Sequence, residues 1–291
     1  MTAELLPLAT AVATDDALFT LHGLPQADPS APVVLLSPAM GTPARFYRPL
    51  AAELHRAGLT PVVLEQRGQG ERSHHTEDFG YAELIDDLEA AIAGLRAAYP
   101  VAPLAVLGHS LGGQLALLQA ARGAGTRRPA PDAVAVVAAG SVWYRAFGAL
   151  GGAGVLAFSQ FAGLTARLLG RWPGHRLGFG GRQPARIMRD WARTSRTGRY
   201  EVGGTDYEAL LRRLHLPVLA VGVAGDSYAP PGAVSHLVGK VPGARLEEWR
   251  YTASRAGGRR LDHFRWVRHG AGVADHVAEW MGRAARALPQ A

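Results

Sequence analysis

A serine near the middle of the chain lies in a motif typical of nucleophilic catalysis, Gly108-His109-Ser110-Leu111-Gly112-Gly113. An apolar run at residues 103–107 precedes the motif, and a helix-like run at residues 114–121 follows it. A strand that turns sharply into a helix exposes such a serine on a strained elbow, and the glycines leave room for the crowded backbone. We therefore predict that Ser110 is a nucleophile.

A serine hydroxyl is a weak nucleophile near neutral pH, so it needs a base to take its proton and an acid to orient that base. After an elbow of this kind the acid and then the base follow along the chain, at the ends of later strands. Asp226 comes directly after the apolar run 217–223 and is the predicted acid, although a helix cap or a plain turn would also place an aspartate there. Asp190 and Asp206 are its rivals.

His263 is the predicted base, because it follows the last predicted strand by a loop and precedes the C-terminal helix. A lone histidine is usually structural, but this place in the strand order favours a catalytic role. We expect His109 to pack within the elbow rather than to act as the base. The remaining candidates lie in or beside less suitable elements: His215, His236, His269 and His276.

The oxyanion that forms during acyl transfer needs two N–H donors. One is expected from the backbone of Leu111, directly after the nucleophile. The other is expected from the loop after the strand at residues 33–36, where Pro38 has no N–H. This leaves Ala39 or Met40, and we slightly favour Ala39.

Short apolar runs alternate with helical patterns, which predicts an α/β fold with a mostly parallel sheet covered by helices on both faces. An early strand at residues 17–22 is expected to be antiparallel. The other predicted strands lie at 33–36, 61–64, from Leu104, and at 132–139, 217–223 and 244–251. The predicted helices lie at 45–57, 81–98, 111–121 and 271–287.

Residues 140–216 break this alternation, and a structureless loop of that length is implausible in a compact domain. We predict an α/β core at 1–140 and 216–291 with an inserted, mainly helical cap at 141–215. The uncharged run 146–166 is interpreted as a buried or pocket-lining helix rather than a membrane span. The predicted substrate-pocket residues are His109, Trp143, Tyr144, Phe158, Trp191 and Tyr228.

Composition narrows the function classes. The 291 residues include no cysteine, which excludes thiol catalysis and disulfides. The formal charge of +7 could suggest nucleic acid, but the arginines are scattered and no nucleic-acid motif accompanies them, so we expect no nucleic-acid partner. The N-terminus does not resemble a signal peptide, and we expect a cytoplasmic protein.

Cofactor and metal signals are weak. His74 and His75 are adjacent, so they would not face one site on a helix, and no metalloprotease or phosphate-loop motif is present. The turn Arg67-Gly68-Gln69-Gly70 lacks the third glycine of a dinucleotide fingerprint. We predict no cofactor and no metal.

The chain resembles the α/β-hydrolase superfamily over its full length, and more narrowly a bacterial group of predicted α/β hydrolases. The resemblance rests on five segments: Pro38-Ala39-Met40-Gly41 with Phe46-Tyr47-Arg48, Arg67-Gly68-Gln69-Gly70, the serine motif continued to Gln114, Asp226-Ser227-Tyr228-Ala229-Pro230, and Asp262-His263-Phe264-Arg265. It implies a triad of Ser110, His263 and Asp226 and an acyl-enzyme mechanism. Two departures, Ser37-Pro38 for the usual His-Gly and Glu65-Gln66 for the usual aspartate, weaken any transfer of substrate.

The preferred function is hydrolysis of a carboxylic ester or thioester by a serine hydrolase, with an apolar acyl or aromatic small-molecule substrate. An acyltransferase would use the same acyl-enzyme, and an amide or carbon–carbon hydrolase is a further variant. A non-catalytic ligand-binding homologue is a less favoured alternative. The aromatic residues could instead simply pack the cap onto the core. The sequence does not indicate an oligomeric state.

Overall fold

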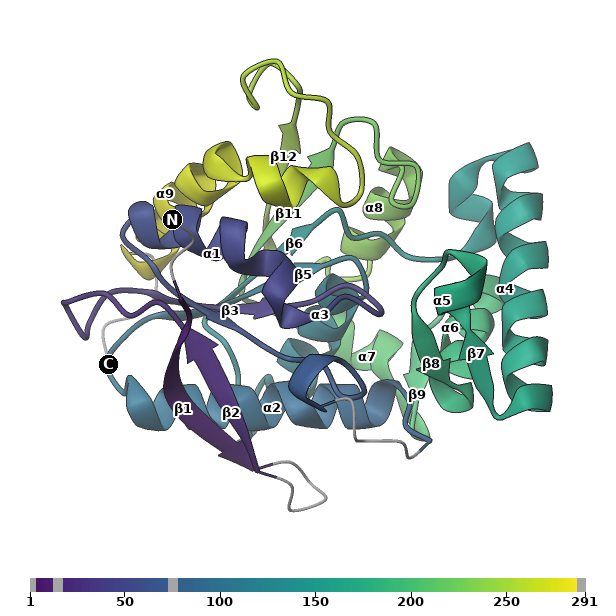
Figure 1. Cartoon of the computed structure of the whole chain (residues 1–291), viewed down its shortest axis with the longest axis horizontal. Helices are drawn as coiled ribbons and strands as arrows, with labels where there is room; N and C mark the ends of the chain where they lie inside the picture. Colours follow the sequence, from purple (N-terminus) through teal and green to yellow (C-terminus); the bar gives the residue numbers. More distant parts are fainter. Residues whose placement is uncertain (1–3, 13–17, 73–77, 287–291) are drawn as a thin grey trace.

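The computed structural model describes residues 4–12, 18–72 and 78–286. Its centre is an eight-stranded sheet in the order β1-β2-β4-β3-β5-β6-β11-β12 (Figure 1). The strands are β1 (Leu6–Val12), β2 (Leu18–Gly23), β3 (Val33–Ser37), β4 (Thr60–Val63), β5 (Leu104–His109), β6 (Ala133–Val137), β11 (Pro217–Val223) and β12 (Arg245–Tyr251). This arrangement confirms the predicted α/β fold.

The sheet is antiparallel only at one edge. Strands β1 and β2 pair antiparallel, as do β2 and β4, whereas all pairs from β4 to β12 are parallel. Every residue of β3, β4, β5 and β6 is buried, because both faces of a parallel sheet are covered. The carboxyl ends of the parallel strands therefore meet at one edge, where residues from distant parts of the chain come together.

Helices form a layer on each face of the sheet (Figure 1). Helices α1 and α9 share one apolar cluster with the sheet, and α2, α3, α7 and α8 share the other. The bounds are α1 (Arg48–Arg56), α2 (Tyr81–Ala98), α3 (Leu111–Gly123), α7 (Tyr207–Leu211), α8 (Pro231–Val238) and α9 (Ala271–Arg286), with short 3₁₀ helices at Ala44–Tyr47, Gly70–Arg72 and Arg265–His269.

The chain between β6 and β11 contributes no strand to the large sheet in the part that the structure describes. It contains a 3₁₀ helix at Tyr144–Phe147, α4 (Ala149–Leu169), β7 (Arg171–Pro173), α5 (Gly174–Leu177), β8 (Arg182–Pro184), α6 (Ala185–Thr197), β9 (Glu201–Val202) and β10 (Thr205–Asp206). The pairs β7–β8 and β9–β10 are hairpins that the sequence did not predict, because strands of two or three residues are too short to show alternation.

Helix α4 lies at the outer edge of the molecule and packs along α6 (Figure 1). It corresponds to the uncharged run that we expected to be buried or pocket-lining. The pocket-lining alternative holds for Val155 and Phe158, whereas only Gly152, Ser159, Ala162 and Ala166 of this helix are buried. These small residues allow close approach to α6, while most of the larger apolar side chains of α4 are exposed to solvent.

Candidate active site

The turn between β5 and α3 carries Ser110 in a strained backbone conformation, with φ 54° and ψ −117°. A non-glycine residue rarely adopts positive φ, and such strain concentrates at functional sites. A Cβ atom on Gly108 would collide with the backbone of Gly112, and one on Gly112 would collide with the carbonyl group of Ser37. The two glycines are therefore required for the turn to close.

Ser110, His263 and Asp226 form a continuous hydrogen-bonded chain. His263 Nε2 lies 2.9 Å from Ser110 Oγ, and His263 Nδ1 lies 3.0 and 2.9 Å from the two carboxylate oxygens of Asp226. A carboxylate only accepts, so Nδ1 carries the proton of a neutral ring and Nε2 is free to accept the serine proton. This is the arrangement that a general base requires.

The ends of β11 and β12 position the acid and the base. Asp226 follows β11 by a turn in which Gly225 has φ +79°, and its Oδ1 accepts the backbone N–H groups of Tyr228 and Ala229 at 2.8 and 3.0 Å. His263 lies in the loop after β12, and both side chains are almost fully buried. The turn at the end of β11 thus fixes the orientation of the Asp226 carboxylate.

The two candidate oxyanion donors after β3 differ in their hydrogen bonding. The N–H of Ala39 donates to the hydroxyl oxygen of Tyr47 at 2.8 Å, so it is not available to a substrate. Our slight preference for Ala39 is therefore wrong. The N–H of Met40 makes no hydrogen bond to any residue that the structure describes, and Met40 lines the cavity beside Ser110. Leu111 is the first residue of α3, where a backbone N–H has no partner within the helix.

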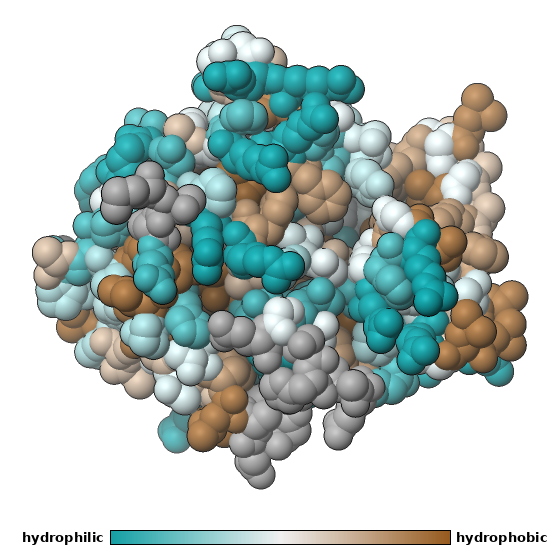
Figure 2. All heavy atoms as spheres, viewed as in Figure 1, coloured by the Kyte–Doolittle hydropathy of each residue, from teal (hydrophilic) through white to brown (hydrophobic). Residues whose placement is uncertain are grey.

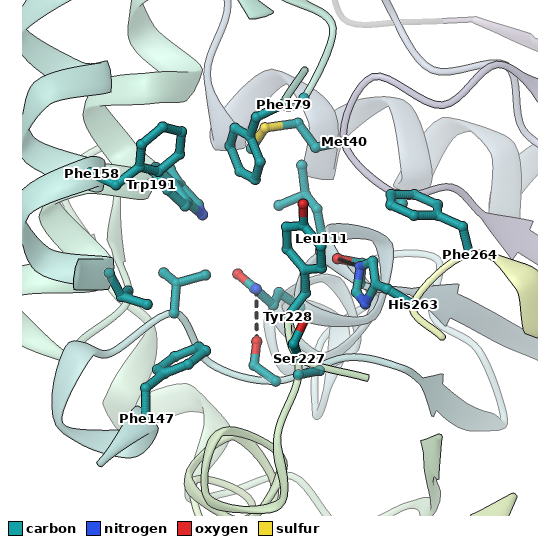
Figure 3. Close-up of a pocket in the computed structure, with 18 of the residues that line it drawn as sticks. Met40, Leu111, Phe147, Phe158, Phe179, Trp191, Ser227, Tyr228, His263 and Phe264 are labelled. Carbon is teal, nitrogen blue, oxygen red and sulfur yellow. Dashed lines mark hydrogen bonds between the residues drawn. The ribbon is translucent and has the colours of Figure 1, made fainter. Parts of the chain in front are cut away.

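A cavity of about 470 Å³ opens above Ser110 and His263 (Figure 3). Three of the six predicted pocket residues, Phe158, Trp191 and Tyr228, line it. The sequence did not indicate several further apolar lining residues, which lie between β6 and β11 or in the loop after β12 and belong to no recognisable motif: Phe147, Val155, Leu177, Phe179 and Phe264. Figure 3 shows aromatic side chains on opposite sides of the open space.

The other three predicted pocket residues do not line the cavity. His109 is fully buried behind the elbow, where it also contacts the ring of Trp266. Trp143 packs against the ring of His236, and the hydroxyl of Tyr144 accepts a hydrogen bond from Arg145. The prediction was wrong for these residues because aromatic composition does not indicate which side of a segment faces the substrate.

His109 instead connects the base to the loop after β3. Its Nε2–H donates to the carbonyl oxygen of His263 at 2.8 Å, so its Nδ1 accepts the hydroxyl proton of Tyr47, also at 2.8 Å. The Tyr47 oxygen accepts the N–H of Ala39 in turn. The side chains of Tyr47 and His109 thus connect the loop that carries Met40 to the loop that carries His263 through buried hydrogen bonds. The sequence placed His109 in the packing of the elbow but did not indicate these partners.

We expect the free energy of unfolding to fall less on acidification in His109→Gln than in the wild-type protein. Burial, together with the nearby His263, holds the pKa of His109 well below 6.5. Below about pH 6.5 the unfolded chain therefore binds a proton that the folded chain does not, and the free energy of unfolding falls by up to ~1.4 kcal/mol per pH unit. Glutamine retains a donor and an acceptor but does not titrate.

The measurement is urea unfolding of both proteins at several pH values between about 5 and 7. His175→Gln, at an exposed position, is the matched control. An unchanged slope of stability against pH in His109→Gln would contradict the prediction.

The described residues contain no group of three or more His, Asp or Glu side chains that could hold a metal ion. The adjacent pair His74 and His75 lies outside the described residues.

Comparison with known proteins places this geometry in context. The family model described as serine aminopeptidase, S33, matches residues 28–197. No sequence among the curated proteins matches this chain.

Three solved structures have similar folds at 16% sequence identity. The protein Rv0554 of Mycobacterium tuberculosis has a TM-score of 0.62 and covers 96% of this chain and 99% of its own. An esterase domain from Rhodothermus marinus has a TM-score of 0.61, with 97% and 99% covered. An esterase from Pyrococcus furiosus also has a TM-score of 0.61, with 97% and 91% covered. At this identity the similarity establishes the fold alone.

The family match covers more than half of the chain and includes the elbow with Ser110, and the eight-stranded sheet has the fold of the similar structures. The chain therefore belongs to the serine aminopeptidase S33 family of α/β hydrolases and is a hydrolase.

Proposed function

We propose that this protein is a serine hydrolase that cleaves carboxylic esters with an apolar acyl group through an acyl-enzyme on Ser110. The observation that carries the proposal is the hydrogen-bonded chain Ser110–His263–Asp226 at the floor of an apolar cavity. The esterases among the structures of similar fold are consistent with it.

The mechanism follows from the positions of the donors and acceptors. His263 Nε2 takes the proton of Ser110 while Oγ bonds to the ester carbonyl carbon, and the N–H groups of Leu111 and Met40 stabilise the resulting oxyanion. The intermediate collapses, the ester C–O bond breaks, and His263 returns the proton to the leaving alcohol. Water, deprotonated by His263, then hydrolyses the acyl-enzyme and releases the acid. Asp226 keeps the imidazole in the required tautomer throughout.

The lining of the cavity favours an apolar acid over an amino acid. Among the described residues that line it, the polar side chains are Ser110, Gln114, Ser227, Tyr228 and His263, and none is Asp or Glu. The free ammonium group of an aminopeptidase substrate would be buried there without a carboxylate partner, which is costly. The remaining surface is aromatic and aliphatic and suits a hydrocarbon chain or ring.

A fluorophosphonate probe and a panel of p-nitrophenyl esters test the proposal. The wild-type protein should be labelled at Ser110, and Ser110→Ala should be neither labelled nor active. We expect kcat/KM to increase with acyl length until the cavity is filled, and an amino-acid p-nitroanilide to remain uncleaved. Ser227→Ala, at a neighbouring cavity serine, is the matched control and should still be labelled. A wild-type protein that is never labelled would refute the proposal.

A further inference from the structure

One face of α4 exposes an apolar stripe to solvent. Three of its members are three or four residues apart, and the fourth lies eleven residues earlier, about three helical turns, so all four lie on one side of the helix. The larger side chains are strongly exposed, with 92% of Leu150, 56% of Phe161, 57% of Leu164 and 74% of Leu168 accessible. We call Leu150, Phe161, Leu164 and Leu168 the α4 stripe. In Figure 2 hydrophobic side chains lie along the outer edge of the molecule where α4 runs.

The opposite side of α4 packs against the rest of the protein. Ser159 donates a hydrogen bond to Ser195 of α6, and Gln160 donates to the carbonyl oxygen of Ala192 in the same helix. Val155 and Phe158 line the cavity. Ala149–Leu169 is long and apolar enough to cross a membrane by length and composition. Because one side is bound to α6 and the cavity, the exposed side suits the plane of an interface rather than a bilayer core.

The segment around α4 also carries the positive charge of the protein. Residues 141–198 contain nine arginines and one acidic residue, Asp190, so their formal charge is +8. The whole chain has a charge of +7, so the remainder has a charge of −1.

Four exposed arginines accompany the α4 stripe, at the end of α4 and in the adjoining β7, α5 and β8: Arg167, Arg171, Arg176 and Arg182. None of them forms an ion pair with another described residue. Trp172 and Gln183, which pair across the β7–β8 hairpin, are buried, so the flanking Arg171 and Arg182 point outward. Figure 2 shows hydrophilic side chains over this region beside the hydrophobic edge.

We propose that this face docks on an anionic lipid surface, with the α4 stripe in the acyl region and the arginines on the lipid headgroups. An exposed apolar helix face flanked by unpaired cations is the combination that binds such interfaces. A second copy of this chain would cover the stripe but would bring two segments of charge +8 together, so charge complementarity favours lipid.

The docked orientation would also serve the cavity. Leu177 of α5 lines the cavity and is 53% exposed, so the lining reaches the surface beside the arginines. A lipid-dissolved ester could therefore pass to Ser110 along apolar side chains. This route depends on the function proposed above, whereas the docking itself does not.

Co-sedimentation of the full chain with lipid vesicles tests the docking. The vesicles contain phosphatidylcholine alone or an equal mixture with phosphatidylglycerol, and the protein carries Ser110→Ala so that turnover does not alter the lipid. We expect partitioning to the mixed vesicles to be at least about tenfold stronger and to weaken with added salt. Both Phe161→Ser/Leu164→Ser/Leu168→Ser and Arg171→Gln/Arg176→Gln/Arg182→Gln should remove most of it.

The matched control is Arg250→Gln/Arg259→Gln/Arg268→Gln, which removes three exposed arginines outside the segment and should leave binding unchanged. Circular dichroism confirms that each variant is folded. Equal binding to neutral vesicles, or an equal loss in the control, would overturn the proposal. The proposal would also be overturned if the protein did not bind vesicles and instead formed a dimer in sedimentation experiments, and if the three serine substitutions dissociated that dimer. Vesicle binding without any ester hydrolysis by the wild-type protein would instead refute the proposed function and leave the docking intact.

Discussion

Replacing His263 with alanine is expected to lower kcat for ester hydrolysis by about 10⁴- to 10⁶-fold, with little change in KM. The Nε2 atom of His263 lies 2.9 Å from Ser110 Oγ, and no other described side chain hydrogen-bonds to that oxygen. Without this base the serine must lose its proton to water, and the leaving alcohol has no proton donor. Because the aromatic and aliphatic side chains that line the cavity are unchanged in this variant, substrate binding should be largely retained.

His276→Ala is the matched control for this experiment. His276 also pairs with a carboxylate, Glu247, at 2.9 Å, but it lies on α9 away from the cavity. Its replacement should leave kcat for a p-nitrophenyl ester within about twofold of wild type. A His263→Ala protein that keeps more than about a tenth of wild-type kcat would show that another group is the base.

Replacing Asp87 with alanine is expected to lower the free energy of unfolding by about 3–5 kcal/mol. Asp87, on α2, accepts two hydrogen bonds from Arg67 at 3.1 and 2.7 Å and one from Arg72 at 2.9 Å. All three side chains are at most 5% exposed. Removing the carboxylate would take away the buried counter-charge that both guanidinium groups contact, and loss of one partner from a buried ion pair is the costly case.

Two further variants separate this explanation from a general effect on α2. Asp86→Ala, one residue earlier, removes one of the two carboxylates that pair with Arg122, and Asp86 is 26% exposed, so the loss should be about 1 kcal/mol or less. The triple substitution Arg67→Met/Asp87→Leu/Arg72→Met removes all three charges and should recover much of the stability. Urea unfolding measures both quantities. Equal losses for Asp86→Ala and Asp87→Ala would show that charge burial is not the cause.

Strong local patterns allowed several elements to be predicted closely. The helix at 81–98 and the strand at 217–223 have the predicted bounds, because a regular apolar stripe and an unbroken apolar run determine them locally. Strand β1 was missed, since it contains Pro7 and lies at the edge of the sheet with little burial. The expected helix at 45–57 is a 3₁₀ turn followed by α1, with Pro49 in the first turn of α1.

The sequence by itself determined the fold class and the order of the candidate catalytic residues, because strand ends and glycine turns are local features of the chain. Tertiary structure decided which groups face the cavity. Tyr47 contacts the N–H of Ala39 and excludes it as a donor, and His109 is turned away from the cavity, although it directly precedes Ser110. It also placed the apolar stripe of α4 outside rather than in the core. Hydrophobic periodicity shows that a helix has two faces, but only the packing of distant segments determines what each face meets.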